Sequence, residues 1–258
     1  MIDQVATFFN ELGWLANLIG VGTPIIGAGF LIYRNRTTLL GVSSFVDLTT
    51  KLIVPKWQDA DSVRKIIAVA IVDDNPADFP VVDLQRAGYQ IKTYKQVSLK
   101  DIARLAEYDV VFLDIHGIIK DDIDEGGLKL LPKLREANPR QKICAVSSKT
   151  FDPTATAFFK QADDVQKKPV NAQKCKDVID TLALEKLNPT LLSSCLDDET
   201  KEYGVYARRL LLKQVKDFAV STTPVSELSE KISAVGKLDL ALGNTLTDYI
   251  RILRHAVC

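Results

Sequence analysis

The stretch IIAVAIVDD, residues 66–74, decides the fold class of this chain. It is a short apolar run, rich in β-branched residues, that ends in two aspartates, which is typical of a buried parallel strand. Three further segments have a similar form: VVFLDIHG at 110–117, KICAVSS at 142–148 and the shorter ADDVQKKPV at 162–170. In an open parallel sheet, residues just past the carboxyl ends of the strands share one crevice. We therefore predict an α/β fold with a doubly wound parallel sheet.

Five polar side chains from these segments are expected to meet in that crevice. They are Asp73, Asp74, Asp114, Ser147 and Lys168. Clustered carboxylates repel one another, and a divalent cation among them removes the repulsion. A carboxylate beside Mg²⁺ and a lysine is suited to accept a phosphoryl group. The pattern predicts phosphoryl transfer at this edge of the sheet.

The ordered set of motifs resembles the receiver domain of two-component response regulators, the CheY-like family. The resemblance covers residues 65–188 and implies a flavodoxin-like, five-stranded parallel sheet. It implies that Asp114 is the phosphoacceptor, that Asp74 binds Mg²⁺ directly and that Asp73 binds it through water. The backbone carbonyl of His116 would complete the protein part of the metal shell.

The same resemblance gives roles to the last two members of the set. Ser147 takes the place of the switch hydroxyl, and Lys168 contacts the phosphoryl group. The bond from Lys168 to Pro169 is expected to be cis. The implied partner is a histidine kinase or a phosphotransfer protein. Because the only chemistry is self-modification, we do not expect an enzyme with a turnover substrate.

Two departures from the family pattern lie beside the predicted site. The segment from Asp114 to Gly127 contains no proline and is longer than usual, and the aromatic switch position is Val165. They favour an alternative, a pseudo-receiver that is never phosphorylated and acts as an interaction module. An aspartate-nucleophile phosphatase would need a second aspartate where His116 stands, so this class is disfavoured.

The loop after Asp114 leaves two interpretations open. His116 either lines the entrance to the site or is an exposed histidine with no role. The acidic residues Asp121, Asp122, Asp124 and Glu125 do not follow the EF-hand ligand order, so we interpret them as a solvated loop.

Composition excludes several classes of protein. The chain has 33 basic and 33 acidic residues, so no net charge draws it to nucleic acid, and the C-terminal third shows no basic recognition helix. Its two histidines and four scattered cysteines do not have zinc-site spacing.

An uncharged apolar run occupies residues 12–32 and is long enough to span a bilayer as a helix. Acidic residues precede it, and Arg34 and Arg36 follow it, so the positive-inside rule places the N-terminus outside and the rest in the cytoplasm. We predict a single-pass anchor in the inner (cell) membrane. The alternative is a buried hairpin, or a helix docked on a partner, because the run contains Pro24 and five glycines.

The predicted organisation has four parts. Residues 1–36 form the anchor. In 37–64, the stretch 39–54 is an amphipathic helix lying along the membrane or against the receiver, and 55–65 is a polar linker. Residues 65–188 form the receiver, and 189–258 form a helical region.

The helical C-terminal region carries an apolar stripe at steps of three and four residues. Its members are Val235, Leu238, Leu242, Leu246, Tyr249 and Leu253. The stripe predicts either a helical hairpin that pairs with a second copy or a partner, or a helix that packs on this chain's own domain.

Overall fold

The computed structural model describes residues 42–55, 57, 60–119, 126–148, 153–224, 227, 232 and 239–257. The predicted membrane segment 12–32 and the acidic loop 120–125 lie outside these residues. Among the helices of the described ranges, none has the length and apolar character needed to cross a bilayer.

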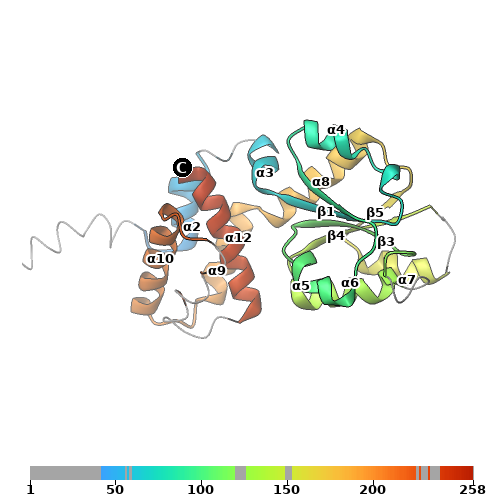
Figure 1. Cartoon of the computed structure of the whole chain (residues 1–258). Helices are drawn as coiled ribbons and strands as arrows, with labels where there is room; N and C mark the ends of the chain where they lie inside the picture. The colour runs from blue at the N-terminus through green and yellow to red at the C-terminus, as the bar shows by residue number, and fades with distance from the viewer. Residues whose placement is uncertain are drawn as a thin grey trace, which may run out of the picture. The chain divides into compact units, whose positions relative to one another are not determined.

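A parallel sheet of five strands is the centre of the fold, in the order β2-β1-β3-β4-β5 (Figure 1). This order confirms the predicted flavodoxin-like, doubly wound sheet. Strand β3 pairs with both β1 and β4 and is buried along its whole length, as its uninterrupted apolar sequence predicts. The strands are β1 Ala68–Val72, β2 Gln90–Tyr94, β3 Val110–Asp114, β4 Lys142–Ser147 and β5 Asp164–Lys167.

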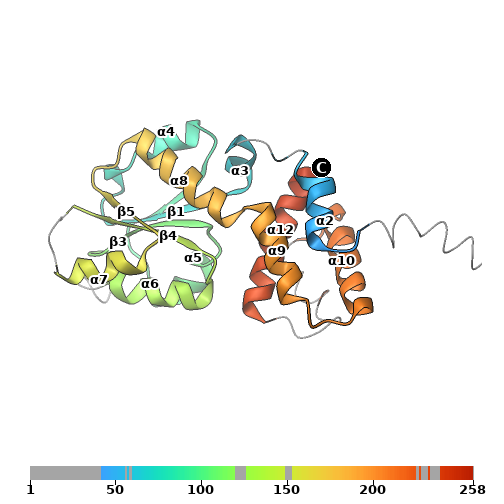
Figure 2. The same ribbon diagram turned by 180° about the vertical axis from the view of Figure 1, so that it is seen from behind.

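Helices cover both faces of the sheet. Figures 1 and 2 show α4 and α8 on one face and α5, α6 and α7 on the other. Side chains of the second group fill a core with the inward residues of the strands, including Val111, Leu113, Leu130, Leu134, Ile143 and Phe158. Burying each such side chain contributes about 1.5–3 kcal/mol. The helices are α4 Val81–Arg86, α5 Ile102–Leu105, α6 Gly126–Ala137, α7 Pro153–Gln161 and α8 Ala172–Lys186; the single turns η2 Pro76–Asp78 and η3 Leu99–Asp101 accompany them.

A bundle of helices follows the sheet domain in the chain. Helix α8 ends at Lys186, and α9, Pro189–Glu199, begins with a proline after the N-cap Asn188, whose side chain accepts the Leu191 N–H. The remaining members are α10, Val205–Val220, and α12, Leu240–Val257, and α12 packs against both α9 and α10.

The N-terminal end of the described chain belongs to this bundle. Helix α2, Phe45–Leu48, and the π-helical turn η1, Thr49–Ile53, pack against α9 and α12. The Tyr249 and Phe45 rings lie 5.5 Å apart at 89°, and the Thr49 and Tyr249 hydroxyls are 2.9 Å apart. The predicted packing of this segment against the receiver was wrong, because it packs on helices whose residues lie 150 to 200 positions later in the chain. Its position along the membrane stays a prediction.

The predicted linker is also partly helical. Helix α3, Ala60–Ile66, packs on α8 and α12. Arg64 donates to both oxygens of Asp180 on α8, at 3.3 and 2.6 Å, and its guanidinium lies over the Tyr89 ring. These partners, rather than local apolar periodicity, hold the segment in place.

The apolar stripe of α12 is buried within this chain. Leu242, Leu246, Tyr249 and Leu253 are at most 4% exposed. The interpretation that the stripe packs on this chain's own domain is therefore correct for these residues. Pairing with a second copy through them was wrong, since their surface is already covered; Val235 and Leu238 lie outside the described residues.

A buried group of charges joins α8 and α12 to the amino end of β3. Asp109 immediately precedes β3, and its carboxylate accepts hydrogen bonds from Lys186 at 2.5 Å and from Arg251 at 2.7 and 2.8 Å. It also accepts the Ala68 backbone N–H at 2.8 Å. Asp248 pairs with Lys186 at 3.3 Å and with Arg140 at 2.9 Å. We call Asp109, Asp248, Lys186, Arg251 and Arg140 the amino-end cluster.

Candidate functional site

Three aspartates lie together at the carboxyl ends of β1 and β3. Asp73 and Asp74 follow β1, and Asp114 is the last residue of β3. Each offers a carboxylate oxygen, and these oxygens lie within 4.8 Å of one another. Asp73 is fully buried, Asp114 is 7% exposed and Asp74 is exposed. The topology thus brings together the acidic residues that the sequence singled out, with one of them open to solvent.

Lys168 inserts its ammonium group between two of these carboxylates. Its Nζ donates to Asp114 Oδ2 at 2.5 Å and forms an ion pair with Asp73 Oδ2, also at 2.5 Å. The Lys168 backbone N–H donates to the Ser147 carbonyl at 3.1 Å, which ties the segment after β5 to the end of β4. The Lys168–Pro169 bond is cis, as expected. We call Asp73, Asp74, Asp114 and Lys168 the acidic site.

Burial and charge shape the ionisation of the acidic site. Burial raises the pKa of Asp73, and the nearby Lys168 ammonium and the Asn75 N–H oppose the rise without cancelling it. Burial alone would lower the pKa of Lys168, but its contacts with Asp114 and Asp73 outweigh burial and raise it. Lys168 is therefore held charged, whereas ionised Asp73 is incompletely compensated.

The acidic site has the properties of a divalent-cation site. Three carboxylates face one ammonium. Asp73 Oδ2 is buried and, apart from the Lys168 ion pair, has no hydrogen-bond partner of good geometry among the described residues. A hard cation with oxygen ligands, such as Mg²⁺, would balance the excess negative charge and would give Asp73 Oδ2 a partner. Asp73, Asp74 and Asp114 are the side chains that would hold it.

The other two predicted site residues lie beside the acidic site. Ser147 ends β4 and is 5% exposed, and in the strand register it stands one residue beyond the partner of Asp114. His116 lies in the loop after β3 and is half-buried. Its side chain is not among those that group as possible metal ligands in the described chain, and the predicted contact was through its backbone carbonyl.

Residues 115–119, the described part of the loop after β3, are more buried than the sequence suggested. Ile115, Ile118 and Ile119 are at most 2% exposed and belong to the core. Val97 and Ile119 form a parallel β-bridge, and the Val97 N–H donates to Ile118 O at 2.7 Å. The three isoleucines in an otherwise polar loop were the signal for this burial.

Two glycines bring backbone close to the acidic site, and sequence reasoning missed both. Gly117 has φ +73°, and a Cβ there would lie 2.7 Å from Asp74 Oδ2. A Cβ on Gly127, at the start of α6, would overlap the Asp114 carbonyl oxygen. Glycine is required at both positions because no side chain fits against these aspartates.

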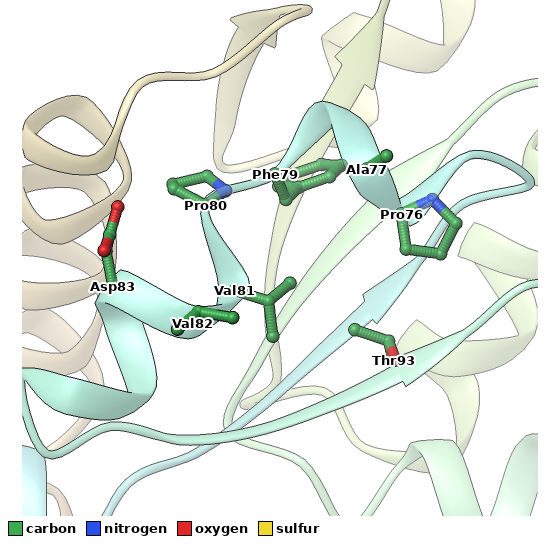
Figure 3. Close-up of a pocket in the computed structure, with 8 residues that line it drawn as sticks. All are labelled: Pro76, Ala77, Phe79, Pro80, Val81, Val82, Asp83 and Thr93. Carbon is green, nitrogen blue, oxygen red and sulfur yellow. The ribbon is translucent and has the colours of Figure 1, made fainter.

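An apolar pocket lies on the turn that leads from β1 into α4 (Figure 3). Its volume is about 390 Å³, and Pro76, Phe79, Pro80 and Val82 form much of its wall. Asp83 and Thr93 are its polar members, and neither belongs to the acidic site. The pocket is therefore a neighbour of the site along the chain and contributes no reactive group to it.

Comparison with known proteins finds similarity to solved structures alone. No protein-family model matches the chain, and no curated protein matches it. A CheY-like receiver domain from Methanospirillum hungatei JF-1 is 21% identical and covers 47% of this chain and 97% of its own, with a TM-score of 0.40. A two-component response regulator from Clostridium difficile is 20% identical and covers 47% of this chain and 98% of its own, with a TM-score of 0.39.

A larger protein shows similarity over more of the chain. NtrX from Brucella abortus, solved in complex with ATP, is 20% identical and covers 65% of this chain and 40% of its own, with a TM-score of 0.40. The fold assignment rests on the strand order and on the geometry described above.

Proposed function

We propose that this chain is a receiver-type signalling protein that accepts a phosphoryl group on Asp114 in a Mg²⁺-dependent phosphorelay. The observation that carries the proposal is the acidic site: carboxylate oxygens of Asp73, Asp74 and Asp114 within 4.8 Å, with Lys168 bonded to Asp114. A structural ion pair needs one carboxylate per cation, whereas this site has three carboxylates and one ammonium group. One of the carboxylates, Asp74, is exposed to solvent.

The reaction transfers a phosphoryl group to this chain from a phosphohistidine or a small acyl phosphate. An Asp114 oxygen attacks phosphorus, the bond from phosphorus to the donor breaks, and the donor leaves with that electron pair. Bound Mg²⁺ would offset charge on the phosphoryl oxygens. Lys168 holds one phosphoryl oxygen as a point charge, and Ser147 donates a hydrogen bond to another. Water later hydrolyses the acyl phosphate.

The partner and location follow from the same proposal. The phosphoryl donor is a histidine kinase or a phosphotransfer protein in the cytoplasm. The apolar run 12–32 anchors the chain in the cell membrane with its N-terminus outside. Because the α12 stripe is internal, output passes through the outer surface of the helical bundle or through the sheet domain.

The second candidate function is a pseudo-receiver, an interaction module that works without phosphorylation. Two observations favour it. Val165 stands where the family has an aromatic switch residue and is 41% exposed. The isoleucines of the loop after β3 are packed in the core, so this side of the site has less freedom to rearrange.

Acetyl-phosphate labelling of the full chain in detergent, with intact mass as readout, separates the two candidates. The full chain is needed because a fragment cut at Pro55 would remove α2 and η1 from the bundle. A phosphoryl adduct that requires Mg²⁺ and disappears in Asp114→Asn is expected. Asp83→Asn, a substitution of an exposed aspartate on α4, should label like the unmodified chain.

Absence of an adduct in the unmodified chain, under conditions that label an ordinary receiver, would reject phosphorylation and leave the pseudo-receiver. An adduct that persists in Asp114→Asn would place the acceptor elsewhere.

A further inference from the structure

Helix α10 presents an outward face of unusual composition. Seven of its residues are exposed: Asp217 and the six residues Val205, Tyr206, Arg209, Lys213, Lys216 and Val220. Successive residues of an α-helix are turned by about 100°, so these six fall within an arc of roughly 100°. We call them the α10 face. The opposite side of the helix is buried through Leu211, Leu212, Val215 and Phe218.

Within the part of the chain that the structure describes, the basic residues of the α10 face lack acidic partners. Arg209, Lys213 and Lys216 form no ion pair with any residue of the described chain. Some exposed basic residues elsewhere in the described chain have a nearby acidic partner, as Lys51 has Asp47 and Lys201 has Asp198. Like charges at such spacing repel one another, which disfavours the isolated helix. Asp217, at the margin of the face, is the nearest acidic position on the helix.

Large apolar side chains lie among these charges. Val205 is 71% exposed, Tyr206 is 82% exposed and Val220 is 61% exposed. They lie at the two ends of the basic row, where an aqueous surface gives them nothing to pack on. Basic residues mixed with exposed aromatic and aliphatic residues on one helix face are the pattern that binds in the headgroup region of an anionic bilayer.

From this composition we infer that the α10 face docks on an anionic phospholipid surface. Phosphate groups would pair with Arg209, Lys213 and Lys216, while Tyr206 and the two valines enter the headgroup layer. An acidic protein would satisfy the charges but not the separated, largely exposed apolar side chains.

Chain continuity agrees with this occupant. Twelve residues separate the apolar run 12–32 from Phe45, a span of at most about 40 Å. Helix α2, which begins at Phe45, packs on α9 in the same bundle as α10. The inference itself rests on α10; the proposed anchor would only keep the bundle near the bilayer.

Lysine footprinting tests the inference on the full chain. The chain is mixed with phosphatidylcholine vesicles or with vesicles containing phosphatidylglycerol, and it is then acetylated briefly and read by peptide mass spectrometry. We expect Lys213 and Lys216 to react roughly fivefold more slowly on the anionic vesicles, and this protection to fall at high salt. Lys92 and Lys100, which are exposed on the sheet domain, should react equally on both.

A charge-reversal triple, Arg209→Glu with Lys213→Glu and Lys216→Glu, sharpens the test. Vesicle flotation should show its preference for anionic over neutral vesicles reduced roughly tenfold or more. The matched control, Lys92→Glu with Lys100→Glu and Lys174→Glu, makes the same change of net charge on the sheet domain and should keep the preference.

Two outcomes would overturn the inference. One is equal reactivity of Lys213 and Lys216 on the two kinds of vesicle. The other is protection that appears without vesicles and grows with protein concentration, which would indicate a protein partner. Neither outcome bears on Asp114 labelling, so failure here is distinct from failure of the phosphorelay proposal.

Discussion

Strand β3 carries a buried aspartate at each end, and both are bound by lysines that flank or end helix α8. Asp114 meets Lys168, three residues before the N-cap of α8, and Asp109 meets Lys186, its last residue. The surroundings differ in the balance of charge. The acidic site has three carboxylates and one cation, whereas the amino-end cluster has two carboxylates and three cations.

This difference in charge indicates that the acidic site binds a ligand, whereas the amino-end cluster stabilises the fold. At the amino end, side chains and a backbone N–H satisfy both oxygens of Asp109. At the carboxyl end, Asp73 Oδ2 has only an ion pair. Burial alone does not distinguish the two, since Asp73 and Asp109 are both fully buried. The two differ in that the acidic site has excess negative charge and one carboxylate, Asp74, open to solvent.

The largest loss of folding stability is expected from the substitution Asp109→Asn. The substitution leaves the buried Lys186 and the partly buried Arg251 with Asp248 as their remaining carboxylate partner in this cluster. The free energy of unfolding should fall by about 3–5 kcal/mol, measured by urea denaturation. Asp198→Asn, which changes an exposed carboxylate paired with Lys201, should cost no more than about 0.5 kcal/mol. Equal small losses in the two variants would remove the structural role assigned to the amino-end cluster.

The pH dependence of stability has a definite sign at Asp109. Burial alone would raise its pKa, but Lys186 and Arg251 hold the pKa of Asp109 well below the usual value. A carboxylate with a depressed folded-state pKa stabilises the protein above its unfolded value, near pH 4, and this contribution is lost as pH falls further. Asp109→Asn should therefore flatten the acid limb of the stability curve below about pH 4.

Mg²⁺ should stabilise the folded protein through the acidic site alone. At a concentration 100-fold above the Kd, the linked gain is about 2.7 kcal/mol, visible as a rise in Tm. Asp74→Ala should abolish most of the gain, and Asp83→Ala on α4 should keep it. A rise of the same size with KCl at equal ionic strength would show that screening, not binding, is responsible.

Gly117→Ala should give a smaller effect of about 1–2 kcal/mol, because it forces a side chain into left-handed backbone at φ +73°. It should also weaken Mg²⁺ binding, since the new Cβ meets Asp74. Gly88→Ala is the matched control: its φ is +94°, and no atom lies within 4 Å of the added Cβ. Titration of Mg²⁺ against Tm should separate the two variants; equal Mg²⁺ affinity would disconnect Gly117 from the site.

The smallest effect, and one of opposite sign, is expected from Asp73→Asn without Mg²⁺. The substitution removes a buried negative charge that is incompletely compensated, and the pKa of Asp73 is raised for the same reason. Stability in EDTA should be unchanged or higher by up to about 1 kcal/mol. A loss comparable to that of Asp109→Asn would mean that the two ends of β3 are equivalent.

The convergence of the acidic site could be predicted because topology alone determines it. Once parallel strands are recognised from their apolar runs, the residues after them must meet at one edge. Asp73, Asp74, Asp114 and Lys168 needed no knowledge of side-chain packing. The close approach of Gly117 and Gly127 could not be predicted in this way, since it depends on the path of a loop.

The amino-end cluster and the bundle could not be predicted for a different reason. Asp109 and Arg251 are 142 residues apart, and neither lies in a pattern that local periodicity makes visible. The segment 45–53 has an amphipathic sequence, but periodicity shows only that one face is covered, not what covers it. Its partners α9 and α12 come from the far end of the chain.

In the sequence, segments of the helical bundle come both before and after the sheet domain. Helix α2 and η1 are the first parts of the bundle to leave the ribosome. Their partner Tyr249 lies 200 residues after Thr49 and is synthesised about 10–40 s later at ordinary elongation rates. The sheet domain lies wholly between them, so its strands can pair while Phe45 and Ile53 still lack their partners. We therefore expect folding during synthesis in two stages, with the apolar side chains of α2 and η1 open to chaperones until α9 and then α12 emerge.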